Sequence, residues 1–207
     1  MLNIRKRAVG NQQSNTLSSD NESNTTDSTL QDPVQPSEQQ AAAEFLRQLQ
    51  EGNEAAWAQL TNELSPRLYR YLRGNLPTAE DVEDVLNETF VATVKAIVNF
   101  DGRVALSTFI YSIANRKVAD FWRKRKEVQT LQPDAATTAG PDSTGMEFQE
   151  ALSALPERSK QALLLRYHMG MSVSEVAEIM EASYKATESL LTRARRQLQA
   201  VLESTDD

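Results

Sequence analysis

The sequence predicts an all-α protein built from two small helical domains. Apolar residues recur at helical spacing through most of the chain after residue 40. Polar stretches without that periodicity occupy 1–40 and 128–145. A chain of 207 residues, 40% of them hydrophobic, can bury one core of ordinary size or two small ones. We therefore expect a disordered tail at 1–40, a domain at 41–127, a flexible linker at 128–145 and a second domain at 146–203.

Composition excludes several classes of protein. The formal net charge of -7 is unusual for a protein that binds DNA unaided, so any basic residues must be clustered or a partner must supply positive charge. The absence of Cys excludes disulfides and thiolate metal sites. No apolar run approaches the ~18 residues of a membrane span, and no apolar segment follows the basic start. We expect a cytoplasmic protein without a cofactor and without membrane contact.

The first domain opens with helical patterns at 41–50 and 54–73, and Pro66 predicts a kink or a split in the second. Thr78 then predicts the cap of a new helix, with Asp81 three residues on. The apolar positions of that helix predict its buried face: Val82, Val85, Leu86, Phe90, Val94 and Ile97.

The opposite face of this helix is acidic. The helix dipole favours acids in the first turn, which explains Glu80 and Asp81 but reaches no further. Asp84 and Glu88 lie one turn apart, where like charges repel. An interaction surface therefore explains the cluster better than a merely solvated face. Its members are Glu80, Asp81, Glu83, Asp84, Asn87 and Glu88.

A turn at 99–103 precedes a helix from Thr108 to about Lys126, with Ser107 as its expected cap. Its core face holds Phe109, Ile110, Ile113, Ala114, Val118 and Phe121. Cations interleaved with aromatic rings on the remaining face suit single-stranded DNA, because rings stack on unpaired bases. The alternative is that Trp122 belongs to the core and the terminal basic residues only complement the helix dipole. The residues are Tyr111, Arg116, Lys117, Trp122, Arg123, Lys124, Arg125 and Lys126, with Asp120 as the single acid.

In the second domain the residue pattern predicts a helix that starts near Pro156 and ends at Gly170. Its expected buried residues are Leu163, Leu164, Leu165 and Tyr167. A short helix, a turn and a longer helix follow over 172–198. Ser172 with Glu175 fits a capping box, and Ser183 can cap the longer helix. This is a helix-turn-helix pattern, although helical hairpins with a solvated polar face share it. The expected exposed face is Tyr184, Lys185, Thr187, Ser189, Thr192, Arg193, Arg195 and Arg196.

Two separated blocks together resemble the extracytoplasmic-function (group 4) sigma factors of bacterial RNA polymerase. The first comprises AEDVEDVLNETF and NFDGRVALSTFIYSIANRKVADFWRKRK, and is similar to conserved region 2. The second, from LPERSKQALLLRYHMGMS through RARRQL, is similar to region 4. The resemblance implies a non-enzymatic subunit that binds core polymerase through the β′ clamp helices and the β flap. It further implies reading of the −10 and −35 promoter elements, melting at −10, and a possible anti-sigma partner.

The resemblance also implies roles for individual positions. It assigns core-polymerase binding to Glu80, Asp81, Asp84, Asn87 and Glu88. It assigns binding of the −10 element to residues of the turn at 99–103 and of the basic aromatic helix that follows. A base flipped out of the duplex needs a pocket to hold it, and the turn is the part matched to that role. The assigned residues are Asn99, Phe100, Asp101, Gly102, Arg103, Ser107, Thr108, Tyr111, Arg116, Lys117, Asp120, Trp122, Arg123 and Lys124. The −35 set is Ser183, Tyr184, Lys185, Thr187, Glu188, Ser189, Thr192, Arg193, Arg195 and Arg196.

Some positions depart from the family's pattern. Phe109 and Ser112 stand where Trp and Arg are usual, and Glu188, Leu190 and Thr192 stand where Lys, Arg and His are frequent. The promoter sequence therefore does not carry over. An alternative is a helix-turn-helix regulator that binds an operator without polymerase, but that leaves the basic aromatic helix unexplained. The sequence does not offer the catalytic residues of a hydrolase, because His168 is the only His and no nucleophile motif is present.

Overall fold

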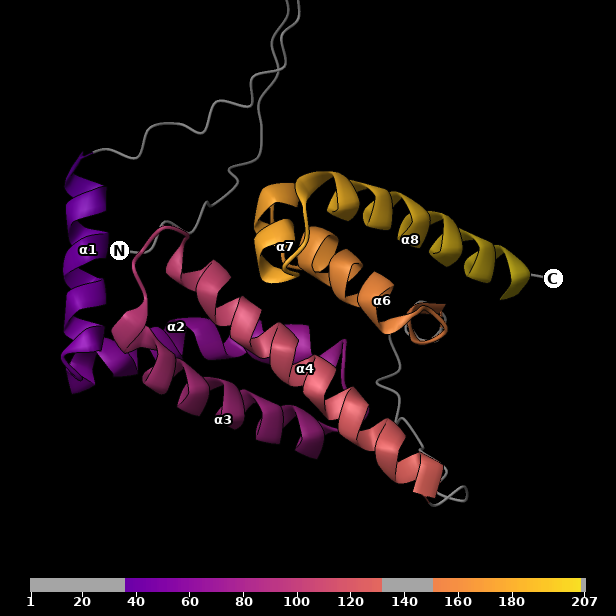
Figure 1. Cartoon of the computed structure of the whole chain (residues 1–207), viewed down its shortest axis with the longest axis horizontal. Coiled ribbons are helices and arrows are strands. Elements are labelled where there is room, and N and C mark those ends of the chain that lie inside the picture. The colour runs from indigo at the N-terminus through magenta and orange to yellow at the C-terminus, as the bar shows by residue number, and fades with distance from the viewer. Residues whose placement is uncertain (1–35, 132–150, 206–207) are drawn as a thin grey trace, which may run out of the picture.

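The computed structural model describes residues 36–131 and 151–205, and every regular element in these ranges is a helix (Figure 1). The fold class predicted from the sequence is confirmed. None of the described helices is long and apolar enough to cross a membrane. The elements are α1 (Pro36–Gln50), α2 (Glu54–Arg73), α3 (Ala79–Ala96), the 3-10 turn η1 (Ile97–Asn99), α4 (Leu106–Leu131), α6 (Glu157–Leu163), the π-helical segment η2 (Leu164–His168), α7 (Val173–Ile179) and α8 (Tyr184–Thr205).

Helices α2, α3 and α4 pack against one another, and α1 crosses the start of α2 and η1. Pro66 lies inside α2, which continues without a break, so the predicted split does not occur. Helix α1 begins at Pro36 rather than at residue 41, and α4 extends past the expected end of the domain at residue 127. The remaining residues of the predicted tail and linker, 1–35 and 132–145, lie outside the described residues.

Helix caps follow the sequence with one exception. Thr78 accepts a hydrogen bond from the Asp81 amide, and Ser183 accepts one from the Ala186 amide. Ser172 and Glu175 form the predicted capping box. The exception is Ser107, because α4 starts at Leu106 and places Ser107 inside the first turn instead of at the cap.

The buried face of α3 differs from the predicted one at its C-terminal half. Val94 is half exposed, whereas Thr89 and Thr93 are fully buried. Each threonine hydroxyl donates to the carbonyl one turn earlier, Thr89 to Val85 at 2.7 Å and Thr93 to Thr89 at 2.8 Å. Because these hydroxyls are satisfied within the helix, threonine fills core positions that a count of apolar residues misses.

The prediction that Tyr167 is buried is wrong, because its side chain is 57% exposed. The amide of Met169 donates to the carbonyl of Leu164, five residues earlier, which makes η2 a π-helical turn. The wider turn takes one more residue than α-helical spacing allows, so side chains after Leu165 rotate away from their expected direction. Leu163, Leu164 and Leu165 remain buried as predicted.

The C-terminal half contains the predicted pair of helices joined by a tight turn. Helices α7 and α8 pack against each other, and α6 packs along α8. Residues 151–153, which precede α6, are helical as well. In the turn, Glu181 adopts a φ of 52°, a left-handed conformation that is unusual for a residue with a side chain.

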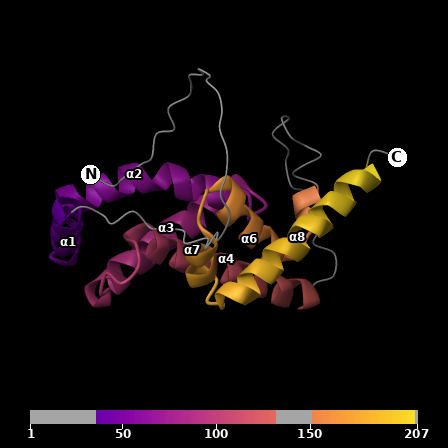
Figure 2. The same cartoon turned by 90° about the horizontal axis from the view of Figure 1, so that it is seen from above.

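The two halves pack against each other, which the sequence did not predict. Helix α4 contacts α7, and the end of α2 contacts η2, so that α4 lies between α3 and the C-terminal helices (Figures 1 and 2). Buried residues of both halves form one continuous hydrophobic cluster. At Gly74 an added Cβ would lie 2.8 Å from Cδ1 of Leu164, so the close approach of α2 to η2 depends on glycine.

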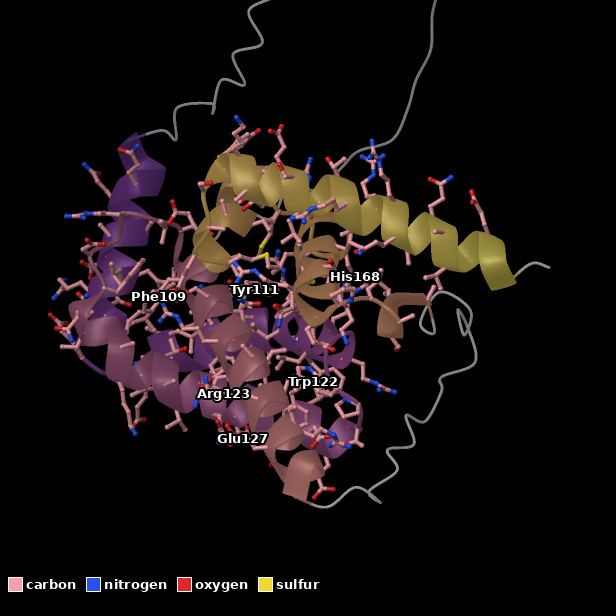
Figure 3. The ribbon with its side chains drawn as sticks, turned by 45° about the vertical axis from the view of Figure 1, so that its right-hand side comes forward. Phe109, Tyr111, Trp122, Arg123, Glu127 and His168 are labelled. Carbon is pink, nitrogen blue, oxygen red and sulfur yellow. The ribbon has the colours of Figure 1, made fainter. Side chains whose placement is uncertain are left out.

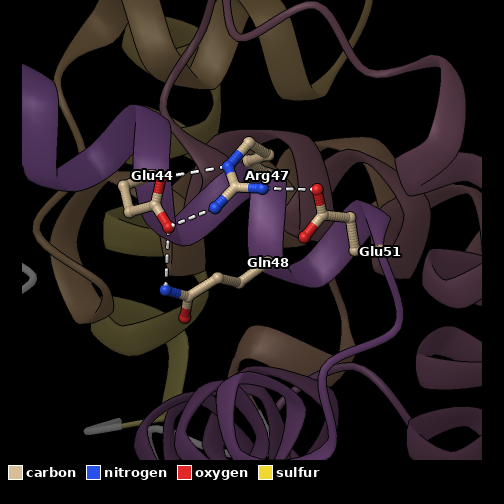
Figure 4. Close-up of polar contacts among 4 residues, drawn as sticks. All are labelled: Glu44, Arg47, Gln48 and Glu51. Atoms are coloured by element: carbon tan, nitrogen blue, oxygen red, sulfur yellow. Dashed lines mark hydrogen bonds and ion pairs between the residues drawn. The ribbon is translucent and has the colours of Figure 1, made fainter.

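The exposed surface of α1 is covered by a local polar network (Figure 4). Arg47 donates to Glu44 at 2.7 Å and also pairs with Glu51, and Gln48 donates to Glu44 at 3.1 Å. These hydrogen bonds, with that from Arg47 as the largest cause, lower the pKa of Glu44 to about 2. This surface is separate from the three that the following section describes.

Candidate functional site

Helix α3 presents an exposed face made of two parts. Its N-terminal part carries the acidic cluster, in which Glu80, Asp84 and Asn87 are exposed. Asp81 is less available for contact with another molecule, because its carboxylate already accepts a hydrogen bond from the Thr78 hydroxyl at 2.6 Å. Glu88 is held by Lys117 of α4 at 2.9 Å, and this hydrogen bond is the largest of the causes that lower the Glu88 pKa.

Valine side chains continue the same face toward the C-terminal end of α3. Val91, Val94 and Val98 are 57%, 50% and 63% exposed. Steps of three and four residues place them in line with Asp84 and Asn87. Val91 and Val94 lie on α3 and Val98 lies in the following turn η1. Large exposed apolar residues are few in the described part of the chain, so these three form a candidate surface for a partner. The sequence pattern missed it, because Val94 was counted as core.

The loop at 99–103 is held firmly. The Gln50 side chain donates to the carbonyls of Ile97 and Phe100, both at 3.0 Å. Phe100 stacks on Phe109 with 4.3 Å between ring centroids. The Asp101 carboxylate accepts from the Arg103 amide and pairs with the Arg103 guanidinium at 2.9 Å.

Gly102 completes this turn with a φ of 75°, a conformation that glycine adopts without strain. Asn99, Asp101, Gly102 and Arg103 are exposed, whereas the Phe100 ring is packed into the molecule. The loop therefore offers polar groups on a rigid support.

Helix α4 divides the predicted −10 residues between two environments. Thr108 and Tyr111 are buried, and burial raises the pKa of Tyr111 to about 12. The Trp122 indole donates to the Asn75 carbonyl at 3.1 Å and lies under the Lys160 ammonium, 5.4 Å from the ring centroid. The expectation that Tyr111 stands on the surface opposite the core is therefore wrong, and of the two alternatives for Trp122 the structure agrees with the one that packs it against the core (Figure 3).

The charged residues of α4 remain at the surface, and most are paired. Arg116 pairs with Glu181 of the C-terminal half, and Lys117 pairs with Glu88 of α3. Arg123 pairs with Asp120 at 2.9 Å, and Lys124 is exposed. Arg123 and Lys124 therefore keep exposed side chains at the basic end of α4.

Helix α8 presents the expected polar face with one correction. Thr187 is fully buried, and its hydroxyl has no hydrogen-bond partner. It lies on the side with Leu191 and Ala194, four and seven residues later, which is the buried side of the helix. Ser183 caps the helix, and the other predicted −35 residues are exposed: Tyr184, Lys185, Glu188, Ser189, Thr192, Arg193, Arg195 and Arg196.

The residues that the structure describes contain no cluster of His, Asp or Glu able to hold a metal ion. One cavity of about 530 Å³ lies at the junction of the halves, lined by Arg70, Arg73, Leu152, Leu164 and His168 among others. His168 is exposed there, and no Ser, Thr or Cys is among the residues that line this cavity.

Two family models match this chain. Residues 60–128 match the family model of sigma-70 region 2, and residues 145–198 match that of sigma-70 region 4. The chain is 29% identical over 174 residues to the RNA polymerase sigma factor CnrH of Cupriavidus metallidurans, covering 75% of this chain and 91% of CnrH. It is 23% identical over 176 residues to SigW of Bacillus subtilis, covering 76% of this chain and 94% of SigW.

Among solved structures, CnrH in complex with the cytosolic domain of CnrY aligns with a TM-score of 0.63. That alignment covers 79% of this chain and 98% of CnrH, at 27% identity. The two region models lie in the expected order and together match more than half of the residues. The chain belongs to the extracytoplasmic-function branch of the sigma-70 family of RNA polymerase sigma factors.

Proposed function

We propose that this sigma factor directs transcription initiation through three separate surfaces, each formed by a different helix. The exposed face of α3 binds the clamp of core polymerase, the loop at 99–103 with α4 reads and melts the −10 element, and α8 reads the −35 element. What carries this assignment is the position of α8. It follows the tight turn after α7 and exposes polar and basic side chains along its first turns, as a helix that enters a major groove requires.

The charge distribution supports a division of labour among these surfaces. Polymerase binding through α3 relies on carboxylates and valines, whereas both proposed DNA surfaces carry exposed cations. An acidic protein binds DNA weakly alone, because phosphate neutralisation supplies most non-specific affinity. Attachment to polymerase places both DNA surfaces at the promoter, so that modest contacts suffice for discrimination.

Reconstitution with core polymerase tests the function. We expect promoter-dependent initiation from a library of genomic fragments, with start sites that share −35 and −10 sequences. The operator-binding alternative predicts the opposite pattern, in which the chain shifts a duplex alone at physiological salt and adds nothing to polymerase. That second result would refute the assignment.

Charge reversal tests the α3 surface. Asp84→Lys with Glu88→Lys should abolish binding to core polymerase, because two exposed carboxylates become repulsive to the surface they match. The matched control reverses Glu127 and Glu203, which are exposed but lie outside this surface. If the α3 variant binds core polymerase as tightly as the control, the α3 assignment is wrong.

The valine stripe makes a second, apolar contribution to the same surface. Val91→Ser with Val98→Ser should weaken polymerase binding while leaving the melting temperature nearly unchanged, because both side chains are exposed in the free chain. Equal losses of binding and stability would instead place the valines in the packing of the protein itself.

A protein partner of the anti-sigma class is also part of the proposal. The solved structure of CnrH holds the cytosolic domain of CnrY, which supports a partner that binds a sigma factor of this shape. A partner that covered the α3 face would prevent attachment to polymerase. Competition between such a partner and core polymerase for the chain is the measurement that tests this.

A further inference from the structure

Gln50, the last residue of α1, reaches the loop at 99–103 from outside it. Helix α1 contacts η1, which leads into this loop (Figure 1). The side-chain nitrogen of Gln50 donates to the carbonyl oxygens of Ile97 and Phe100, both at 3.0 Å. A glutamine amide has two N–H groups, so each carbonyl receives one. These bonds join residues 47 and 50 positions apart, and they fix the backbone at the entry to the loop relative to α1.

Helix α1 is itself a fixed support. The Trp57 indole of α2 donates to the Leu49 carbonyl at 3.0 Å, and the amide of Asn53 donates to the Gln48 carbonyl at 2.9 Å. Leu49 is 1% exposed and anchors the last turn of α1 in the core. Gln50 therefore projects from a helix end that cannot shift without breaking these contacts.

A second contact from α1 meets the loop at its glycine. An added Cβ at Gly102 would lie 3.5 Å from Cδ2 of Leu46, an ordinary van der Waals distance, so the Leu46 side chain lies next to the residue with the positive φ. The ion pair between Asp101 and Arg103 lies within the loop and moves with it. The bonds from Gln50, in contrast, hold the loop to the rest of the molecule.

We propose that Gln50 is a positioning residue for recognition of the −10 element. Its two hydrogen bonds set where the backbone of the loop at 99–103 lies relative to α4, and the exposed polar groups of the loop meet a base only from that place. Discrimination between bases depends on hydrogen bonds, which weaken steeply as their geometry departs from the best values. Gln50 touches no DNA and acts only through the loop. This inference rests on the proposed role of the loop.

Two substitutions remove the hydrogen bonds without removing bulk. Gln50→Glu keeps the shape of the side chain but faces both carbonyls with a carboxylate, which donates no hydrogen bond. Gln50→Met loses the donors without adding charge, and it serves if the carboxylate disturbs folding. The matched control is Gln40→Glu, the same change at an exposed position of α1.

Base selectivity at the −10 element is the decisive measurement. Initiation with core polymerase is compared on versions of one promoter used by the parent chain, each differing by a single −10 base. The ratio of rates on preferred and disfavoured bases should fall several-fold for Gln50→Glu and Gln50→Met, and stay at the parent value for Gln40→Glu. A variant that is only partly unfolded lowers the rate on every promoter by the same factor and leaves this ratio unchanged.

Two further measurements separate a displaced loop from a general defect. Amide exchange at 99–103 should rise in Gln50→Met while exchange in α8 stays at the parent value. Binding to core polymerase and to a −35 duplex should also match the parent, because Gln50 lies outside the α3 and α8 surfaces.

The outcomes that overturn the proposal are distinct from those that overturn the proposed function. If both Gln50 variants keep the parent's base ratio, or if Gln40→Glu lowers it equally, Gln50 does not position the loop for recognition. Unchanged amide exchange in the loop would also refute the proposal. The proposed function fails separately, since it falls only if polymerase with the parent chain gives no promoter-dependent initiation.

Discussion

The two helices proposed to read promoter DNA differ in their availability. Helix α8 exposes nearly all of its predicted contact residues, and only Thr187 is turned inward. Helix α4 has Thr108 and Tyr111 buried, Trp122 in contact with Asn75, and Arg116 paired across the junction. In the free chain the proposed duplex-reading surface is therefore exposed, whereas part of the proposed surface for a melted strand is packed against the protein itself.

This difference agrees with the order in which the two DNA forms arise at a promoter. A duplex −35 element exists before any melting, so its reader gains from permanent exposure. An unpaired −10 strand exists only once melting begins, and exposed rings with cations would otherwise bind any single strand non-specifically. The predictions below test this contrast between α4 and α8, from the largest expected effect to the smallest.

Locking the halves together gives the largest effect. Arg116→Cys with Glu181→Cys places the only two thiols of the chain across the junction, where a short bis-maleimide links them. The linked protein should lose promoter melting with core polymerase almost completely, because α4 stays covered, yet keep binding to a −35 duplex through α8. Permanganate footprinting of the −10 region and a duplex mobility shift measure the two activities.

The control for this experiment is the same double variant treated with a mono-functional maleimide. It carries the same loss of Arg116 and the same modified thiols without the link. If both proteins melt the promoter equally well, separation of the halves is not needed and the contrast between α4 and α8 has no functional meaning.

Truncating a buried side chain tests whether the halves are stabilised as one unit. Leu165→Ala should lower the free energy of unfolding by about 2–5 kcal/mol, because Leu165 is fully buried in the shared cluster. Amide exchange should also rise in α4. The control is Leu198→Ala at a partly buried position of α8, where the loss should be smaller. Faster exchange confined to residues 151–205 would show that the halves are independent.

The sequence predicted the local structure well because its signals are local. Apolar spacing predicted the helices, and Thr78, Ser172 with Glu175, and Ser183 predicted where three of them begin. The errors come from effects that spacing does not record. Thr93 is core because its hydroxyl bonds within α3, and Tyr167 is exposed because one π-helical turn shifts the register.

The packing between the halves could not be read from the sequence. Trp122 was given two possible roles, and the side of α4 that turns inward depends on partners up to 65 residues away, such as Glu181 opposite Arg116. Gly74 follows a helix and looks like an ordinary helix end. Only its distance to Leu164 shows that it permits close approach. The residues of the three proposed surfaces were thus predictable as types, and so was most of the exposed face of α8, but the burial of residues on α4 was not.

Removing one exposed cation from α8 should give an intermediate effect. Arg193→Ala should weaken binding to a −35 duplex and reduce the slope of log K against log salt by about 1, as expected for the loss of one phosphate contact. Arg116→Ala is the matched control on α4, and it should leave duplex binding unchanged. Equal effects of the two changes would mean that α4 and α8 are equally available, which contradicts the contrast.

The smallest effect concerns the link between α3 and α4. Lys117 holds the pKa of Glu88 below its usual value, so the pair stabilises the fold above the pKa of an unfolded Glu and ceases to do so as pH falls through the lowered pKa. Lys117→Met should raise the Glu88 pKa and remove less than about 1 kcal/mol of stability at pH 7, because the pair is exposed. Carboxyl NMR titration measures the pKa, and urea unfolding at pH 7 and at low pH measures the stability.

Lys124→Met is the control, since Lys124 acts on Glu88 only through space and should shift its pKa less. Should both variants shift it equally, Glu88 is not held by Lys117, and the α3 surface is independent of α4.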